Sequence, residues 1–556
     1  MTYADRFRNS LIVDILEWTG FVTLDHNFSP QVAQAANENS GTTSRASIDS
    51  QLEDIEKKAD SAGAAETLFG AANETTVEAI YHDDVSIDPF LVDWNGPDDP
   101  EKPVNWPLAK KSIVVAQIMY YTFVTYMGSS IYTPGQPAIQ EEFHVGHVPA
   151  TLTLSLFILG YSIGPMVFSP ISEVSTVGRN YIYMVTLFLF WILQIGVATT
   201  PSFAGLLILR FLTGIVCSPS ISTGGASLGD FVSQDVLPIF IGLWAVGGFL
   251  APSLAPLLGA SMLVAKNWRW SFWLLMWLAA FSWLVMLFFL PETQAANVLY
   301  RRAKRVRKQT GDNRYYTKQE REDSKIEFKP FVKELLLRPF ILIAIEPGIL
   351  AWDAYLSLTY GTYYLFFEAF PIVYTNTYHF GPVLLGLSYI GFAIGCAVGY
   401  LVFYTFLQTE VFPRIKSQTF TPETYLKLTM WVCFFLPTSL FIFGWAAQEH
   451  WVIPILAEVI YAAAAFNIFQ SGFAYLTTNY PRYMASVFAG NAFMRSAFAV
   501  AFPLFGQAMY DNLGTPKFPV GWGSTLLGFV TLLMALVPFV LYRLGPKLRG
   551  RSKYAN

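Results

Sequence analysis

The sequence predicts an all-α integral membrane protein in which twelve transmembrane helices form two bundles of six (6+6), with both termini cytosolic. Three observations lead to this fold class: a shortage of charge, a series of long apolar runs, and basic residues confined to alternate connections. The 556 residues are 53% hydrophobic and 14% charged, whereas soluble domains are about a quarter charged. Mean hydropathy is +0.39. The net charge of −4 gives no reason to expect a nucleic-acid partner.

The first 111 residues are predicted to be a disordered cytosolic tail and linker. The apolar stretch 11–24 contains Asp14 and Glu17 and lacks a cleavage pattern, so it is not a secretory signal. It is either an amphipathic surface segment or a locally collapsed piece of the tail. From about residue 25 to 105 the chain is polar and acidic, as disordered segments are. The four prolines and one glycine of 93–107 exclude a continuous helix.

The predicted spans follow from runs of about 20 apolar residues, the length that crosses a bilayer as a helix. Six precede and six follow a hydrophilic connection at 294–338, which defines an N-terminal bundle (112–293), a C-terminal bundle (339–544) and a tail at 545–556. The runs are 112–134, 148–171, 181–200, 204–227, 237–263, 270–290, 348–373, 382–407, 428–447, 451–476, 485–510 and 521–543. Two related six-span halves are typical of transporters.

Lysine and arginine set the orientation of these spans. The central connection carries the basic run 301–308, and the C-terminal tail is basic as well. The connections on the opposite side offer only Lys266, Arg269 and Lys517. The positive-inside rule therefore places both termini and the central loop in the cytosol. Next to a span, the basic run is better explained by topology and anionic lipid than by nucleic acid.

Two basic residues lie well inside predicted spans, away from the span ends: Arg210 and Arg495. A charge at the bilayer centre costs about 2.5–3.5 kcal/mol on insertion scales. On a helical wheel, Arg210 shares its face with small and polar residues such as Gly214 and Ser218, which suits a bundle interior. It could otherwise snorkel to the interface, or donate to backbone carbonyls. Arg495 is either a donor in helix packing or a substrate contact.

Two further stretches combine small residues with prolines. In 160–179, Gly160 and Gly164 allow close approach of a neighbouring helix, and the charges near its end bracket a turn that could be an ordinary capped turn. In 247–260, two prolines and two glycines share one helical face, which permits a bend. Tight packing of small residues is the competing interpretation of that face.

These stretches, with "RFLTG" (210–214) and "DPEKPVNW" (99–106), resemble the signatures of the major facilitator superfamily and, within it, of the fungal twelve-span drug:proton antiporters. The resemblance implies the major facilitator fold and plasma-membrane export of azoles such as fluconazole, of benomyl and of unrelated toxicants by alternating access. The proton gradient would drive export without a cofactor, and the chain would be a monomer. This sequence departs from the family signatures at two places. Four residues separate Glu173 from Gly178 instead of two, and Ala251 and Ala255 replace glycines.

The resemblance also assigns roles by position. Proton coupling falls to Arg210 and Gly214, with the partner acid left open among Asp353, Glu368 and Glu458. The cytosolic gate comprises Gly160, Gly164, Pro165, Ser172, Glu173, Gly178 and Arg179. A carboxylate meeting a helix N-terminus, or a cation across the two halves, would hold it closed. The antiporter helix carries Gly247, Gly248, Pro252, Pro256 and Gly259.

Aromatic and polar residues of the C-terminal half are candidates for the wall of a substrate cavity, although most aromatic residues in spans serve packing or the interfacial belts. The candidate set is Tyr363, Phe367, Glu368, Tyr389, Phe392, Gln470, Arg495 and Phe498. Such walls suit flat, weakly polar compounds. The expected partners are small hydrophobic or amphipathic organic compounds, protons and the lipid bilayer, without nucleic acid.

Other function classes lack sequence support. The chain has no phosphate-binding loop, no serine-hydrolase elbow and no zinc-protease motif, and its three cysteines lie far apart in apolar runs. We therefore expect no catalytic residue, no metal and no cofactor, and a protein that is not an enzyme. Two rivals remain: a nutrient or polyamine carrier on the same fold, and a non-transporting membrane sensor.

Overall fold

The computed structural model describes residues 7–19, 22, 24, 88–233, 236–325 and 328–555. Within this part the chain is helical, and pairing between extended segments is limited to two isolated bridges. The N-terminal half contains α5 (Leu108–Met127), α6 (Gln136–Phe143), α7 (His147–Glu173), α8 (Gly178–Thr199), α9 (Phe203–Ser222), α10 (Gly224–Phe231), α11 (Leu237–Ala265) and α12 (Arg269–Phe289).

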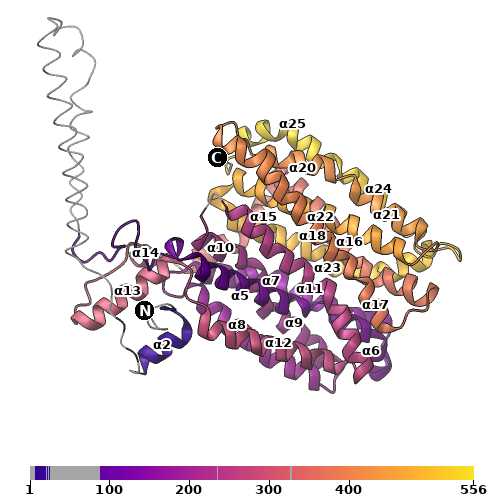
Figure 1. The fold of residues 1–556 in the computed structure, drawn as a ribbon, viewed down its shortest axis with the longest axis horizontal. Helices are drawn as coiled ribbons and strands as arrows, with labels where there is room; N and C mark the ends of the chain where they lie inside the picture. The colour runs from indigo at the N-terminus through magenta and orange to yellow at the C-terminus, as the bar shows by residue number, and fades with distance from the viewer. Residues whose placement is uncertain are drawn as a thin grey trace, which may run out of the picture.

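The connection and the C-terminal half follow in the same helical manner. The connection holds α13 (Ala295–Thr310), α14 (Lys318–Asp323) and α15 (Phe328–Ile345). The C-terminal half contains α16 (Pro347–Phe370), α17 (Pro382–Ser388), α18 (Ile390–Phe406), α19 (Phe412–Lys416), α20 (Thr424–Val432), α21 (Phe435–Ala446), α22 (Val452–Asn479), α23 (Met484–Leu513), α24 (Gly521–Met534) and α25 (Leu536–Arg551). We call the end of the bundle beside α13 and α14 the loop end, and the opposite end the far end (Figure 1).

The two halves repeat one packing pattern. In the N-terminal half α5 packs against α11, α7 against α9, and α8 against α12. In the C-terminal half the corresponding pairs are α16 with α23, α18 with α22, and α21 with α24. The halves meet where α7 contacts α23 and where α11 contacts α17 and α18. The predicted 6+6 repeat therefore appears as repeated helix pairing.

The described helices include ten that are long and apolar enough to cross a membrane, or eleven if the bent pair Leu336–Ile345 and Pro347–Thr377 counts as one span. The chain is a multi-pass membrane protein. Most predicted boundaries fall within three residues of a helix end; the exceptions include both ends of the first run, the start of the run 428–447 and the end of the run 521–543. The run 112–134 continues past the end of α5 at Met127 into turns and a short 3-10 helix at Thr133–Gly135, because hydropathy does not register a change of backbone geometry.

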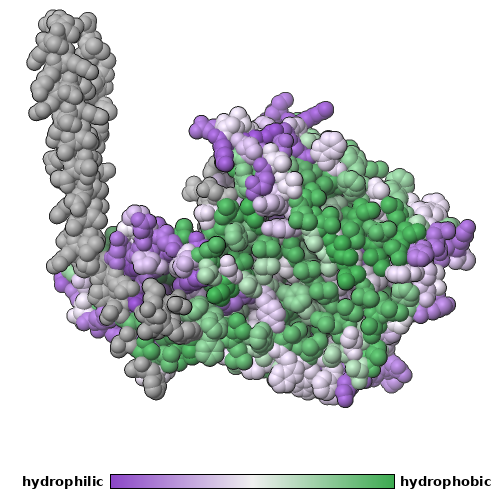
Figure 2. Space-filling view, viewed as in Figure 1, coloured by the Kyte–Doolittle hydropathy of each residue, from purple (hydrophilic) through white to green (hydrophobic). Residues whose placement is uncertain are grey.

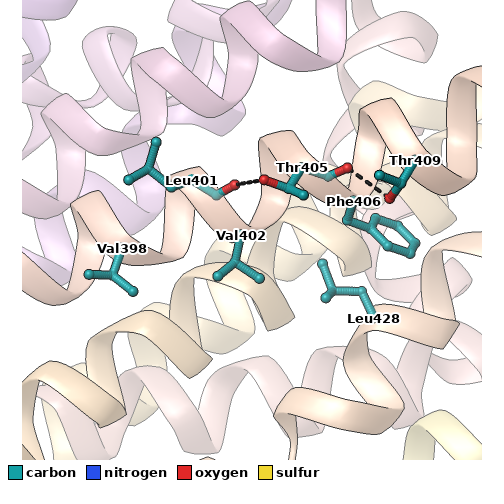
Figure 3. Close-up of a pocket in the computed structure, with 7 residues that line it drawn as sticks. All are labelled: Val398, Leu401, Val402, Thr405, Phe406, Thr409 and Leu428. Atoms are coloured by element: carbon teal, nitrogen blue, oxygen red, sulfur yellow. Dashed lines mark hydrogen bonds between the residues drawn. The ribbon is translucent and has the colours of Figure 1, made fainter.

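The outer surface of the bundle is apolar. Figure 2 shows hydrophobic residues over the helices and hydrophilic residues at the ends of the bundle. Large side chains such as Trp277, Leu401 and Phe529 are more than half exposed there, which fits contact with lipid tails. A shallow groove of about 420 Å³ lies on this surface (Figure 3). It is lined by Val398, Leu401, Val402, Thr405, Phe406, Thr409 and Leu428.

Parts of the N-terminal tail are folded against the loop end, which differs from the expected disorder of 1–111. The helix α2 (Leu11–Trp18) packs on α12. The "DPEKPVNW" segment binds α13, because Arg302 is fully buried between Asp99 at 2.9 Å and Glu101 at 3.0 Å. Trp106 stacks on Phe231 of α10. Composition could not reveal this docking, since the partners lie about 200 residues apart. Residues 25–87 of that prediction lie outside the described residues.

Candidate functional site

Arg210 is fully buried in the N-terminal half rather than extended to an interface. Its three donor groups each reach a backbone carbonyl: Nε donates to Thr153 of α7 at 3.0 Å, Nη1 to Gly128 at 2.7 Å and Nη2 to Ser129 at 3.1 Å. The guanidinium also lies 4.5 Å from the ring centre of Phe157. It forms no ion pair with a carboxylate among the described residues. The sequence-based placement inside the bundle agrees with this geometry.

The acceptors explain how the charge is tolerated. Gly128 and Ser129 directly follow the last residue of α5, where helix carbonyls lack intrahelical partners and the helix dipole is negative. Arg210 therefore satisfies a helix C-terminus and ties α9 to α5 and α7. The sequence left open whether Arg210 extends to the interface or donates to backbone carbonyls, and the observed contacts are those of a donor to backbone carbonyls. None of the three acids considered as its partner contacts it, and its role in proton coupling stays a prediction.

Three motif glycines bring α7 and α9 into backbone contact. A Cβ on Gly214 would lie 2.1 Å from the Phe157 carbonyl oxygen, and one on Gly160 would lie 2.3 Å from that of Phe211. A Cβ on Gly164 would lie 2.1 Å from the Ser218 Oγ. The spacing between Arg210 and Gly214 thus has a steric cause, since the glycine allows the approach that brings the arginine to the α7 carbonyl.

The predicted gate forms a different set of contacts from the one expected. Arg179 pairs with Asp230 of α10 at 2.5 Å, within the N-terminal half. The Glu173 side chain is exposed and makes no ion pair in the described part of the chain. The expected cation across the halves is therefore not the observed partner. Pro165 lies buried in α7, and Ser172 donates to the Ser169 carbonyl of its own helix.

The carboxylate that meets a helix N-terminus is Glu292. It accepts from the backbone N–H groups of Arg179 and Asn180, both at 3.1 Å, at the start of α8. Gly178 has φ +75°, and a Cβ there would lie 2.5 Å from Glu292 Oε2, so this position requires glycine. Sequence analysis missed Asp230 and Glu292; a search for acids near span ends would have included both.

The antiporter helix α11 is continuous through its prolines and lies between the two halves. A Cβ on Gly259 would lie 1.8 Å from the Ile131 carbonyl oxygen, whereas Gly247 and Gly248 have 3.4 Å or more to their nearest neighbours. The Pro252 carbonyl accepts from Ser130 Oγ at 3.2 Å. On the other side, Gly386 of α17 abuts Pro256 and Leu257 closely.

The candidate cavity residues lie in different environments. Tyr363, Phe367, Tyr389 and Phe392 are at most 5% exposed and form a packed aromatic cluster; the Tyr363 and Phe392 ring centres are 4.6 Å apart. Phe498 packs on Phe502 of its own helix. Gln470 is buried in α22. The groove in Figure 3 contains no member of this set, so their contact with cargo stays a prediction.

Glu368 lies at the far end and bridges the halves. Its Oε2 is 2.9 Å from the Nε2 of His147, the first residue of α7. Sequence analysis did not single out His147, because it precedes the predicted second span. Ser155 Oγ of α7 donates to the Val500 carbonyl of α23 at 2.9 Å, so α7 is tied to both α16 and α23 there.

Tyrosine hydroxyls connect the halves at mid-depth. Tyr161 Oη of α7 lies 2.8 Å from Tyr360 Oη and 3.4 Å from Tyr364 Oη, both on α16. Tyr364 in turn reaches Tyr126 Oη of α5 at 3.5 Å. Arg495 of α23 lies beside this network, with its guanidinium carbon 4.9 Å from the Tyr360 ring centre.

Comparisons with known proteins agree with this architecture. The Major Facilitator Superfamily model matches residues 118–503. Fluconazole resistance protein 1 of Saccharomyces cerevisiae is 51% identical over 559 residues, and the match covers 100% of both chains. The multidrug transporter FLR1 of Candida glabrata is also 51% identical, over 566 residues and 100% of both chains.

Two more distant similarities extend the comparison. The cycloheximide resistance protein of Candida maltosa is 43% identical over 84% of this chain and 86% of its own. Among solved structures, a partially occluded inward open form of the xylose transporter XylE from Escherichia coli aligns with a TM-score of 0.53 and 13% identity, over 78% of this chain and 98% of that one. At this identity the likeness concerns the fold alone.

Proposed function

The chain belongs to the Major Facilitator Superfamily, a family of transporters rather than enzymes, and we propose that it exports small hydrophobic or amphipathic organic toxicants in exchange for protons. The observation that carries the proposal is the 51% identity, over the whole of both chains, to a fluconazole resistance protein. Azoles such as fluconazole are the first expected cargo. Cycloheximide and benomyl are the next to test.

The interface between the halves supports this cargo class. Aromatic rings meet across it: Phe249 of α11 contacts Phe466 and Phe469 of α22. The Tyr161 and Tyr360 hydroxyls also meet there. Rings and weakly polar hydroxyls bind flat organic compounds through surface contact and discriminate poorly among them. The few buried charges near the interface give no site for a polyanion.

Export by alternating access requires the far-end contacts to break and re-form. With the basic connection in the cytosol, the far end faces outside the cell. There the His147 to Glu368 pair, the Ser155 hydrogen bond to Val500 and the contact of Gly386 with α11 hold the halves together. Cargo and protons each bias this equilibrium only by their differential affinity for the two states. We place the transporter in the plasma membrane as a monomer, with the proton gradient as its energy source.

The test is the accumulation of labelled fluconazole in yeast that lacks its own drug pumps. Expression of this chain should lower accumulation relative to an empty vector, and a protonophore should restore it. Unchanged accumulation upon expression would contradict drug export and turn attention to nutrient or polyamine uptake. Export that ignores the protonophore would contradict the proton drive while leaving drug transport intact.

A further inference from the structure

The carboxyl group of Asp353 in α16 is fully buried and incompletely bonded. Asn491 Nδ2 of α23 donates to its Oδ1 at 2.8 Å. Its Oδ2 has no hydrogen-bond partner among the described residues. An ionised carboxylate in an apolar interior is costly unless it is paired and hydrogen-bonded. The bare oxygen therefore requires either a proton or a cation.

Arg495 is the cation placed to serve it. It lies on α23 one helical turn beyond Asn491, the residue that donates to Asp353. The Arg495 Nε is buried without a hydrogen-bond partner in the described part of the chain. The acid and the arginine are thus neighbours that each keep one bonding position unused. Arg210, by contrast, has a hydrogen-bond acceptor for each of its three nitrogens.

The contact of Arg495 with Tyr360 connects this site to the meeting surface of the halves. Tyr360 lies two turns beyond Asp353 on α16, under the Arg495 guanidinium. Its hydroxyl is 2.8 Å from Tyr161 of the N-terminal half. A shift of Arg495 between the carboxylate and the ring would therefore change a contact that crosses the halves.

Other charged groups near α16 are already engaged or face elsewhere. On α16 itself, Glu368 is paired with His147. From α22, Glu458 also lacks a hydrogen-bond partner for its carboxylate oxygens among the described residues. It faces Gly391 of α18 inside the C-terminal half, however, where a Cβ would lie 2.4 Å from its Oε2. Near the loop end, Glu346 accepts hydrogen bonds from Tyr480 and Ser552. Arg549 of α25 is paired with Glu423 at 2.8 Å, and Arg338 of α15 stacks on Tyr483.

We propose that Asp353 is the carboxyl group that binds and releases the transported proton, and that Arg495 is the positioning residue that holds the ionised carboxylate. This rests on the proposed function, since it names the proton carrier of that antiport. Proton arrival at Oδ2 forms an O–H bond, neutralises the acid and frees Arg495 to stack on Tyr360. Proton loss to water breaks that bond and returns Arg495 to the carboxylate.

The test uses the full chain reconstituted in liposomes, with labelled fluconazole as the cargo and a pH-sensitive dye to follow protons. Two assays separate the steps: uptake driven by a pH gradient requires proton turnover, whereas exchange of internal for external fluconazole does not. D353N should lose gradient-driven uptake and proton release at least tenfold, with exchange within about threefold of wild type. E346Q is the matched control, a buried acid of the same half whose oxygens accept hydrogen bonds from Tyr480 and Ser552, and should keep both activities.

A pH profile tests the role of Arg495. R495K should retain transport with a shifted pH midpoint, because a lysine point charge replaces the planar guanidinium. Gradient-driven uptake by D353N at the wild-type rate would overturn the assignment. Should D353N fail to fold, D353E decides: a shifted midpoint supports the proposal, and an unchanged one overturns it. If the wild-type protein moves fluconazole without moving protons, the proposed proton drive is refuted instead. The assay on wild-type protein alone shows this, so the two failures can be told apart.

Discussion

Removal of the Arg302 side chain should release the docked N-terminal segment from α13. Arg302 is fully buried and bonds Asp99, Glu101 and the carbonyl of Asp93. Breaking a buried ion pair from one side costs about 3–5 kcal/mol. Asp99 loses its cation in R302A, whereas Glu101 keeps its pair with Arg8 at 2.9 Å, so we expect the lower end of that range, about 3 kcal/mol. At about 1.4 kcal/mol per factor of ten, R302A should raise the undocked population by about two orders of magnitude.

Hydrogen exchange measures this release directly. The amides of Asp99, Lys102 and Asn105 are hydrogen-bonded within the segment and should exchange faster in R302A by a similar factor. R414A is the matched control, since Arg414 pairs with Glu410 in the C-terminal half; its exchange should match wild type. Equal exchange of 95–105 in R302A and wild type, or an equally large effect of R414A, would refute the reasoning.

The same segment has a defined pH response. Burial by itself would raise the pKa of Asp99, but hydrogen bonds from Arg302 and from the backbone N–H groups of Asn95 and Glu101 outweigh burial and lower the pKa below its usual value. A lowered folded-state pKa stabilises docking above the unfolded-state pKa of about 3.9, and the stabilisation is lost as pH falls through the lower value. The amide exchange protection of the segment should therefore be insensitive to titration of Asp99 between about pH 5 and 8.

Three further changes test the site. R210A should abolish efflux and lower the unfolding midpoint while surface delivery persists, and R210K should keep partial function because lysine offers no planar fork for three carbonyls; wild-type efflux in R210A would contradict the assigned role. Gly214→Ala should reduce efflux and stability through its 2.1 Å clash, whereas Gly248→Ala, with 4.0 Å available, should resemble wild type in both assays. H147Q and E368Q should each weaken the far-end closure and raise labelling of a cysteine introduced beside it; unchanged labelling would exclude the pair as a closing contact.

The sequence was sufficient to predict the positions of the spans and the inward orientation of Arg210, because both follow from hydropathy and helical period. It could not predict the acceptors of Arg210, since they are backbone carbonyls exposed by the end of α5 at Met127. The gate shows the same limit. Family position drew attention to Glu173, while the contacts are made by Asp230 and Glu292, which fold back from elements 50 and more residues away.

Contacts between the two halves could not be predicted from the sequence pattern either. The sequence analysis noted aromatic residues in the C-terminal half, but the pairing of Tyr360 with Tyr161 depends on how the two bundles meet. The docked tail depends on an arginine about 200 residues distant. Local composition reports what a segment prefers alone, and each of these contacts is decided by a partner outside the segment.

The hydrogen bonding of the buried charges suggests why Asp353 and Arg495 are suited to proton binding and release. A double variant tests whether the two groups interact. Arg210 has a carbonyl acceptor for each of its three nitrogens. Asp353 and Arg495 each keep one bonding position unused. Either single neutralisation, D353N or R495Q, leaves its partner charged in an apolar site and should lower the unfolding midpoint in detergent. The double variant removes both charges and should be more stable than the sum of the singles by about 0.5–3 kcal/mol, the coupling expected of groups in contact, while gradient-driven transport stays absent. Additive destabilisation would mean that the two groups do not act on one another, and that the proton carrier must be sought elsewhere.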